Sequence, residues 1–219
     1  MNQSEAFLEC RCGACRIVLC DPTVRAHVEC LCYDCRQRGL ISAARNPDNS
    51  LPEEVEKFER GIYLKYFANA FIVDDASTGL LAFSKLTVDG GNTTAMSTCC
   101  GTVMCGVHPL YEGTTISVNT DSCRVTAPCS KPIQLVTFAS DIPVEHAAAI
   151  ARHRQVPVLF AVFEELDNPA MQTFLSEVTE PVSASASAMA TTNFEKLCAQ
   201  KTVTIDNSFF KESRDHSGS

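Results

Sequence analysis

The cysteines constrain this chain more than any other feature of its sequence. There are 13 of them, an odd number, and most lie in tight clusters at positions 10, 12 and 15, at 30, 32 and 35, and at 99 and 100. The first residues lack a basic stretch followed by an apolar one, so we expect no secretory signal peptide and a cytoplasmic, reducing location. Disulfides are rare in that compartment, and clustered cysteines there indicate metal binding.

Length and charge limit the partners of the chain. Its 219 residues suffice for one domain with extensions, and 45% hydrophobic against 20% charged residues is an ordinary globular composition. The net charge of -8 argues against nucleic acid as a partner, because phosphate binding depends on clustered Lys and Arg. The longest apolar run, residues 156–163, is too short to span a membrane and contains Pro157. We therefore expect neither nucleic acid nor membrane as a partner, and the sequence leaves an oligomer open.

The first part of the sequence predicts a mainly β fold. Runs rich in β-branched and aromatic residues, separated by turn residues, are typical of short strands. We expect two strands within residues 7–20, with the first cysteine cluster in their turn, and further strands at 62–67, 71–73, 80–88 and 114–119. The last of these alternates with period two and is predicted to be half-buried. Residues 47–59 are expected to form a surface loop, and Gly39 to close a short turn of helix.

The last part of the sequence differs in character. Good helix formers predict helices at residues 144–154, capped by Ser140 or Asp141, and at 168–178. Alternating Ser and Ala at 183–188 are typical of a flexible linker, and the polar residues 211–219 are expected to be disordered. We thus divide the chain into a cysteine-bearing, zinc-binding β domain (1–135), a helical extension (136–182) and a linker with a polar tail (183–219).

The zinc assignment follows from ligand chemistry. Thiolates are preferred soft ligands of zinc; four of them close a tetrahedral site, whereas three leave a position open for water or substrate. Cys10 and Cys12 cannot close a site alone, and the Cys99–Cys100 region is the obvious supplier of a second pair.

The middle cluster offers a different kind of site. Cys30, Cys32 and Cys35 are three ligands within six residues, so they can hold one face of an ion and leave its fourth position open. Zinc in such a site is a Lewis acid that binds a thiol as thiolate or polarises a carbonyl oxygen.

The order of these motifs resembles the glutathione-dependent formaldehyde-activating enzyme family, which includes centromere protein V. The resemblance covers about residues 7 to 125 and rests on Cys10-Arg11-Cys12-Gly13, Cys30-Leu31-Cys32-Tyr33-Asp34-Cys35-Arg36, Cys100-Gly101-Thr102 and Ile116-Ser117-Val118-Asn119-Thr120-Asp121. It implies an Mss4-like fold of twisted antiparallel sheets around zinc, to which the C-terminal helices are an addition. It also implies a carbon–sulfur lyase whose partner is a small thiol or thiol adduct, as in the joining of glutathione and formaldehyde.

The resemblance assigns roles to the cysteines. It implies a catalytic zinc on Cys30, Cys32 and Cys35, and a structural zinc on Cys10, Cys12 and Cys100.

One departure from the family pattern affects the structural site. The family's third motif is Cys-x-x-Cys-Gly, and here Ser97 stands where its first cysteine should be. Cys99 and Cys105 are candidates for the fourth ligand; alternatively the site is lost, because serine is a poor zinc ligand. One or two zinc ions per chain are therefore expected.

Nearby polar residues receive no site assignment. His108 is interpreted as a structural or surface histidine, and His27 as a strand residue that could also support the triplet. Arg36 could attract an anionic substrate but is more simply a surface ion-pair residue, as is Asp34. The remaining cysteines are interpreted as thiols that are not ligands: Cys15, Cys20, Cys123, Cys129 and Cys198.

Three functions compete. The first is a zinc-dependent lyase or synthase that makes or breaks a carbon–sulfur bond at the open triplet. The alternative is a non-catalytic binding or scaffold protein stabilised by zinc, although both flanks lack the basic run that centromere protein V is thought to use. The third is a specialised lyase for another sulfur metabolite, with the C-terminal helices shaping its pocket.

Overall fold

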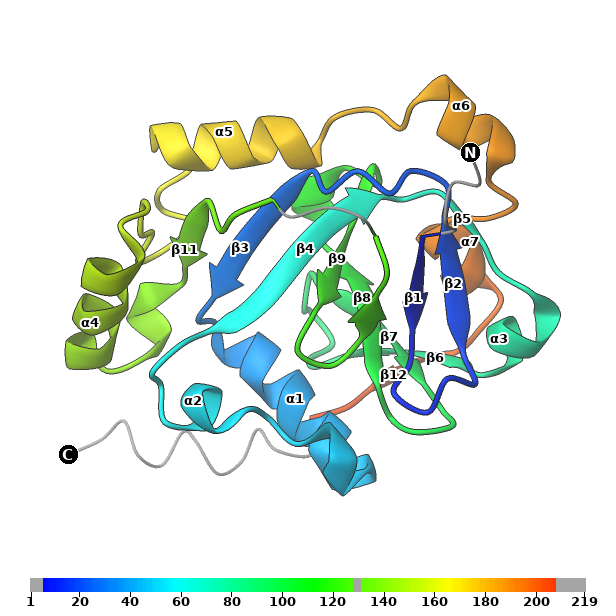
Figure 1. Cartoon of the computed structure of the whole chain (residues 1–219), viewed down its shortest axis with the longest axis horizontal. Coiled ribbons are helices and arrows are strands. Elements are labelled where there is room, and N and C mark those ends of the chain that lie inside the picture. The colour runs from blue at the N-terminus through cyan, green and yellow to red at the C-terminus, as the bar shows by residue number, and fades with distance from the viewer. Residues whose placement is uncertain (1–5, 128–130, 208–219) are drawn as a thin grey trace.

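The computed structural model describes residues 6–127 and 131–207 and is mainly β, as predicted (Figure 1). Its strands are β1 (Phe7–Glu9), β2 (Arg16–Leu19), β3 (Ala26–Cys30), β4 (Ile62–Ala68), β5 (Phe71–Ile72), β6 (Leu81–Lys85), β7 (Thr93–Ser97), β8 (Val103–Val107), β9 (Thr115–Asn119), β10 (Arg124–Val125), β11 (Leu135–Thr137) and β12 (Val203–Ile205). They form a four-stranded sheet of order β10-β1-β2-β5 and an eight-stranded sheet of order β11-β3-β4-β9-β8-β7-β6-β12.

The helices lie between and around these strands (Figure 1). They are α1 (Tyr33–Arg45), α2 (Glu53–Glu56), α3 (Asp75–Gly79), α4 (Val144–Arg154), α5 (Pro169–Val178), α6 (Ala184–Met189) and α7 (Phe194–Ala199), with 3-10 helices at Pro47–Asn49, Pro109–Tyr111 and Ala139–Asp141. The helices predicted at 144–154 and 168–178 are confirmed by α4 and α5.

Not all pairing in the sheets is antiparallel. β11 runs parallel to β3, and β12 runs parallel to β6, so that both edges of the larger sheet come from the C-terminal part of the chain. Parallel neighbours require a crossover connection rather than a hairpin. The expectation of purely antiparallel sheets is therefore wrong at these two edges.

Two hydrophobic clusters cover opposite faces of the larger sheet. In β4, Leu64 and Tyr66 join the cluster that contains Met171 of α5, whereas Phe67 joins the cluster shared with the smaller sheet. Successive side chains of a strand point to opposite faces, so one strand serves both clusters. All five residues of β9 are buried for the same reason, which corrects the prediction of a half-buried strand.

Several local predictions are corrected by the structure. The helix expected to end at Gly39 continues to Arg45, because Gly39 is buried against Leu51 instead of terminating the helix. The expected loop at 47–59 contains a 3-10 helix and α2, whose Val55 is buried in the core.

The C-terminal predictions are also corrected in part. The segment predicted as a flexible linker at 183–188 lies instead in α6 (Ala184–Met189), whose N-cap Ser183 accepts a hydrogen bond from the Ala186 amide at its hydroxyl. The residue at the cap of α4 is Pro143, and the expected caps Ser140 and Asp141 belong to the preceding 3-10 helix. The tail predicted at 211–219 lies outside the described residues.

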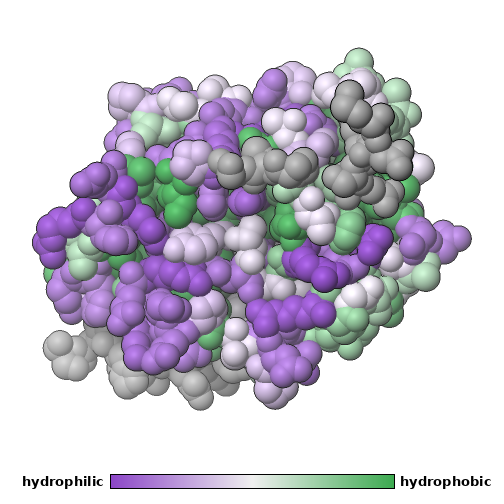
Figure 2. Space-filling model, viewed as in Figure 1, coloured by the Kyte–Doolittle hydropathy of each residue, from purple (hydrophilic) through white to green (hydrophobic). Residues whose placement is uncertain are grey.

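Hydrophilic residues cover most of the face shown in Figure 2, with hydrophobic residues in smaller patches between them. Large exposed hydrophobic side chains include Phe160, Phe163 and Leu166, all in the segment between α4 and α5. Within residues 6–127 and 131–207, no helix combines the length and apolar character needed to cross a membrane.

A buried carboxylate joins α4 to the sheet beside the second cysteine cluster. Glu29 of β3 is fully buried and accepts hydrogen bonds from Arg154 of α4 and, at 2.8 Å, from the Gly61 amide. Arg154 also donates to the Tyr63 hydroxyl at 2.7 Å. A buried charge needs such partners, so this network holds β3, immediately before Cys30, to the start of β4 and to α4.

Gly61 packs too closely against this region to accept a side chain. A Cβ atom at Gly61 would lie 2.5 Å from the carbonyl oxygen of Cys30. We expect Gly61→Ala to lower the free energy of unfolding by about 1–3 kcal/mol, because the backbone at Cys30 must shift. Gly79→Ala is the control, since nothing lies within 4 Å of its Cβ position. Chemical denaturation measures both, and equal stability of the two variants would contradict this packing argument.

Candidate metal centres

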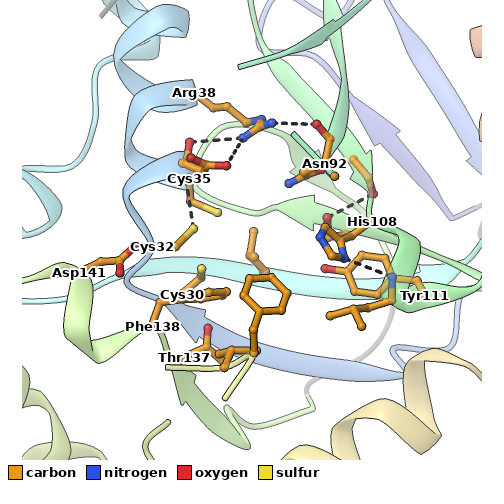
Figure 3. A pocket seen from close by; sticks show the side chains of 18 of the residues that line it. Cys30, Cys32, Cys35, Arg38, Asn92, His108, Tyr111, Thr137, Phe138 and Asp141 are labelled. Atoms are coloured by element: carbon orange, nitrogen blue, oxygen red, sulfur yellow. Dashed lines mark hydrogen bonds and ion pairs between the residues drawn. The ribbon is translucent and has the colours of Figure 1, made fainter. Parts of the chain in front are cut away.

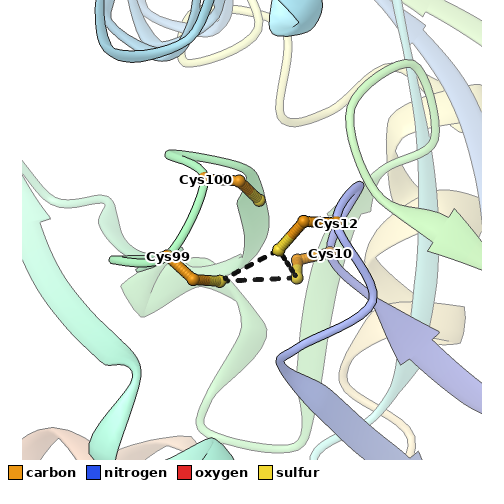
Figure 4. A group of neighbouring side chains, drawn as sticks. All are labelled: Cys10, Cys12, Cys99 and Cys100. Carbon is orange, nitrogen blue, oxygen red and sulfur yellow. Dashed lines mark hydrogen bonds between the residues drawn. The ribbon is translucent and has the colours of Figure 1, made fainter.

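Four cysteines meet where the two sheets approach each other (Figure 4). Cys10 and Cys12 lie in the turn between β1 and β2, and Cys99 and Cys100 lie in the turn between β7 and β8. The Sγ atoms of Cys10 and Cys12 are 3.5 Å apart, and Cys99 Sγ lies 3.6 Å and 3.4 Å from them. All four sulfur atoms lie within 4.8 Å of one another, so this group could hold a metal ion.

Backbone conformation and hydrogen bonds shape both turns. Gly13 and Gly101 have φ values of 80° and 68°, which glycine adopts without the steric cost of a side chain. The Cys15 amide donates to Cys10 Sγ at 3.3 Å, and the Thr102 hydroxyl lies 3.1 Å from Cys100 Sγ. These contacts orient the sulfurs in the way that supporting hydrogen bonds orient metal ligands.

The structure decides between the two candidates for the fourth position. Cys99 belongs to the group, whereas Cys105 is buried in the core cluster that both sheets share. Ser97 is fully buried, and its hydroxyl lies 3.4 Å from Cys100 Sγ. Burial by itself raises the pKa of Cys100, but hydrogen bonds from Ser97 and Thr102 lower it to about 6. Ser97 therefore contacts one of the four sulfurs instead of supplying a sulfur itself.

The second group contains Cys30, Cys32 and Cys35, whose sulfurs also lie within 4.8 Å of one another and could hold a metal ion. Cys30 ends β3, Cys32 is the N-cap of α1, and Cys35 lies in the first turn of that helix. The Cys32 sulfur accepts a hydrogen bond from the Cys35 amide at 3.3 Å. Hydrogen bonds from Cys32 and Cys35 lower the pKa of Cys30 well below its usual value, against the effect of burial.

The three-cysteine group opens on a pocket of about 530 Å³ (Figure 3). Its walls come from the sheet, from α1 and from the C-terminal segment. The residues that line it include Cys30, Cys32, Asp34, Cys35, Arg38, Tyr66, Asn92, His108, Tyr111, Phe138, Asp141, Phe163, Glu164 and Phe174. None of the four cysteines of the first group lines it. The two groups therefore differ in surroundings as well as in number of sulfurs.

Arg38 places a guanidinium in the wall of this pocket, and it was not among the residues predicted from the sequence. It lies three residues after Cys35 and so on the same face of α1, which is the signal that could have identified it. It donates hydrogen bonds to the Thr94 hydroxyl and, at 3.2 Å, to the carbonyl of Asn92, and it lies 3.9 Å from the Asp34 carboxylate. Arg36, the residue considered from the sequence, instead stacks on the Phe58 ring at 3.7 Å.

His108 also lines the pocket, although the sequence suggested a structural or surface role. Its Nδ1 atom accepts a hydrogen bond from the Leu110 amide at 3.2 Å, and burial lowers the pKa of the ring. The neutral ring therefore carries its proton on Nε2. His27 does not line the pocket; its Nδ1 lies 2.7 Å from the carbonyl of Lys131.

The other cysteines lie outside both groups. Cys15 and Cys123 are buried, and burial raises the pKa of Cys15 to about 12. Cys20 and Cys198 are half-buried, and Cys129 lies outside the described residues.

Metal analysis tests the two groups separately. We expect elemental analysis of the purified protein to find two metal ions per chain, and one ion in the triple variant Cys30→Ser, Cys32→Ser, Cys35→Ser, because serine is a poor ligand for a soft-metal site. Cys198→Ser is the control and should keep both ions. A triple variant that keeps its full metal content would exclude the three-cysteine site.

Similarity to known proteins gives no independent identification of the chain. Comparison with protein-family models and with curated proteins finds no match. The resemblance noted above therefore rests on the cysteine motifs and their order along the chain.

Proposed function

We propose that this protein is a zinc-dependent carbon–sulfur lyase or synthase that acts on a thiol adduct, related to the glutathione-dependent formaldehyde-activating enzymes and sharing their Mss4-like fold. One observation carries the proposal: the three-cysteine group forms part of the pocket wall, whereas the four-cysteine group does not. A metal ion held by three sulfurs beside a pocket keeps a coordination position open for substrate, which is typical of a catalytic site. A metal ion held by four sulfurs has no open position, which is typical of a structural site.

The donor atoms of the pocket fit zinc. Cys30, Cys32 and Cys35 offer three sulfur ligands. Zinc binds sulfur ligands well, whereas ions such as magnesium prefer oxygen ligands. Cys32 and Cys35 lie at the start of α1, and the partial positive charge at the amino end of a helix favours the thiolate form of a sulfur there. Zinc bound there would supply a Lewis acid that favours the thiolate form of a substrate thiol.

The pocket residues have distinct tasks in this proposal. In the synthetic direction the substrate sulfur attacks the carbonyl carbon, and the carbonyl electron pair moves to the oxygen. The Nε2–H of neutral His108, which lies across the pocket from the cysteines in Figure 3, donates a hydrogen bond to that oxygen, and the oxygen takes up from solvent the proton that the thiol has released. The lyase direction is the reverse: the hydroxyl loses its proton to solvent, the carbon–sulfur bond breaks, and the sulfur leaves with the bonding electron pair while His108 keeps its hydrogen bond to the oxygen. The carboxamide oxygen of Asn92 is buried without a partner among the described residues, so it is available to accept a hydrogen bond from substrate.

The four-cysteine group has the structural role in this proposal. Its sulfurs come from two turns that are far apart in the sequence, so a zinc ion there would join the two sheets. That role would serve an enzyme and a scaffold protein equally, so only the pocket distinguishes the two functions.

Replacing one sulfur tests the proposed chemistry without removing the helix cap. Serine is a good N-cap residue, so Cys32→Ser should keep the start of α1 while removing a ligand. We expect turnover of thiol and aldehyde, followed by NMR, to fall by about 100-fold or more. Cys198→Ser is the control and should keep full activity. Unchanged turnover in folded Cys32→Ser would instead favour the non-catalytic binding or scaffold function.

His108 is tested by removing its ring. We expect His108→Ala to lower kcat/KM by about 100-fold, the usual range for loss of a hydrogen-bond donor to a developing oxyanion, while metal content and thermal stability stay unchanged. His153→Ala removes an exposed histidine of α4 and serves as the control. If His108→Ala lost metal or stability together with activity, its role would be structural rather than stabilisation of the oxygen's negative charge.

A further inference from the structure

Six aromatic side chains form a continuous chain of ring contacts around the pocket. Ring centroids are 5.8 Å apart for Phe138 and Phe163, and 5.9 Å apart for Phe163 and His108. The chain continues from His108 to Tyr111 at 5.9 Å, from Tyr111 to Tyr66 at 5.4 Å, and from Tyr66 to Phe174 at 5.2 Å. All six line the same pocket as the three-cysteine group. Most of these contacts are edge-to-face, the arrangement that aromatic pairs prefer.

Half of these rings come from the part of the chain that the family resemblance does not cover. Phe138 follows β11, Phe163 lies between α4 and α5, and Phe174 belongs to α5. Phe138 has φ 59° and ψ 44°, a left-handed conformation that costs energy for a residue with a side chain. That backbone is compatible with its ring lying in the pocket next to Cys30 and Thr137, as Figure 3 shows. The C-terminal segment thus adds an aromatic wall to the cysteine site.

Phe163 stands apart from the other rings because it is 57% exposed. It contacts Phe138 on one side and His108 on the other, yet much of its surface faces solvent. A ligand in the pocket would cover part of this ring and would gain hydrophobic contact with it.

The charges of the pocket oppose an anionic ligand. Arg38 is the only Lys or Arg among the described residues that line it, and its guanidinium already has three oxygen partners. Three carboxylates line the same pocket, those of Asp34, Asp141 and Glu164. A ligand that carries carboxylates of its own would meet net negative charge without a free guanidinium to pair with it.

We propose that the pocket selects a thiol adduct whose non-reacting part is an uncharged aromatic ring. The inference rests on the proposed function, since the sulfur of the adduct belongs at the three-cysteine group. The ring lies against Phe163 and its aromatic neighbours, away from the carboxylates beside the cysteines. The C-terminal segment is therefore the part of the chain that determines which thiol enters.

Binding measurements with small probes separate the two claims. We expect calorimetric titration of the metal-replete protein to show that 2-phenylethanethiol binds about ten-fold more tightly than 2-mercaptoethanol, because the phenyl group is buried. It should also bind more tightly than 2-phenylethanol, which has the ring but no thiol. Glutathione, with its two carboxylates, should bind more weakly than 2-phenylethanethiol.

Two single substitutions in one segment provide matched variants. Phe163→Ala should weaken binding of 2-phenylethanethiol about five-fold and leave 2-mercaptoethanol unchanged, because one aromatic contact is lost. Phe160→Ala is the control: Phe160 is 48% exposed in the same segment but does not line the pocket. Both positions are exposed, so neither variant should unfold.

Each outcome has a distinct meaning. Any of three results would overturn this inference. They are equal affinity for 2-phenylethanethiol and 2-mercaptoethanol, equal effects of Phe163→Ala and Phe160→Ala, and tighter binding of glutathione than of 2-phenylethanethiol. A preference for the phenyl group with equal affinity for 2-phenylethanethiol and 2-phenylethanol would support the aromatic wall but contradict thiol binding at the cysteines. Failure of the inference and failure of the proposed function are thereby told apart.

Discussion

The rest of the structure depends on the contact between two turns that carry four cysteines. One turn belongs to the smaller sheet and the other to the larger sheet, so the group is a direct contact between the two sheets. Neither turn is a regular element that would hold its shape alone; glycines with positive φ and hydrogen bonds to sulfur define each one. A metal ion held by the four sulfurs would stabilise the folded chain strongly, because such a site does not exist in the unfolded state.

Helix α1 connects the four-cysteine group to the pocket. Its first turn carries Cys32 and Cys35 of the three-cysteine group. Near its other end, the Ser42 hydroxyl donates a hydrogen bond at 2.6 Å to the carbonyl of Gly101, which follows Cys100. Arg38, between these two points, extends from the same helix into the pocket wall. One rigid helix therefore positions the sulfurs and the guanidinium relative to the junction of the sheets.

The C-terminal part of the chain completes the fold and the site together. It supplies both edge strands of the larger sheet, the Arg154 partner of buried Glu29, and three rings of the pocket. Glu29 is adjacent to Cys30, so the same segment that builds the aromatic wall also restrains the start of the three-cysteine group. Shape and position of the pocket thus depend on a region that carries no cysteine ligand.

The sequence alone predicted strands β1, β2, β4, β5, β6 and β9, the helices α4 and α5, and the two sets of cysteines that come together, because strand periodicity, helix formers and ligand spacing are local properties. It did not predict strands β3, β7, β8 and β10. It did not determine whether Cys99 or Cys105 joins the first group, since that depends on how one turn is shaped. His108 and Arg38 were missed, and the parallel edge strands were not foreseen, for a related reason. Their neighbours are distant in the sequence, and only packing of the whole chain brings such residues into contact.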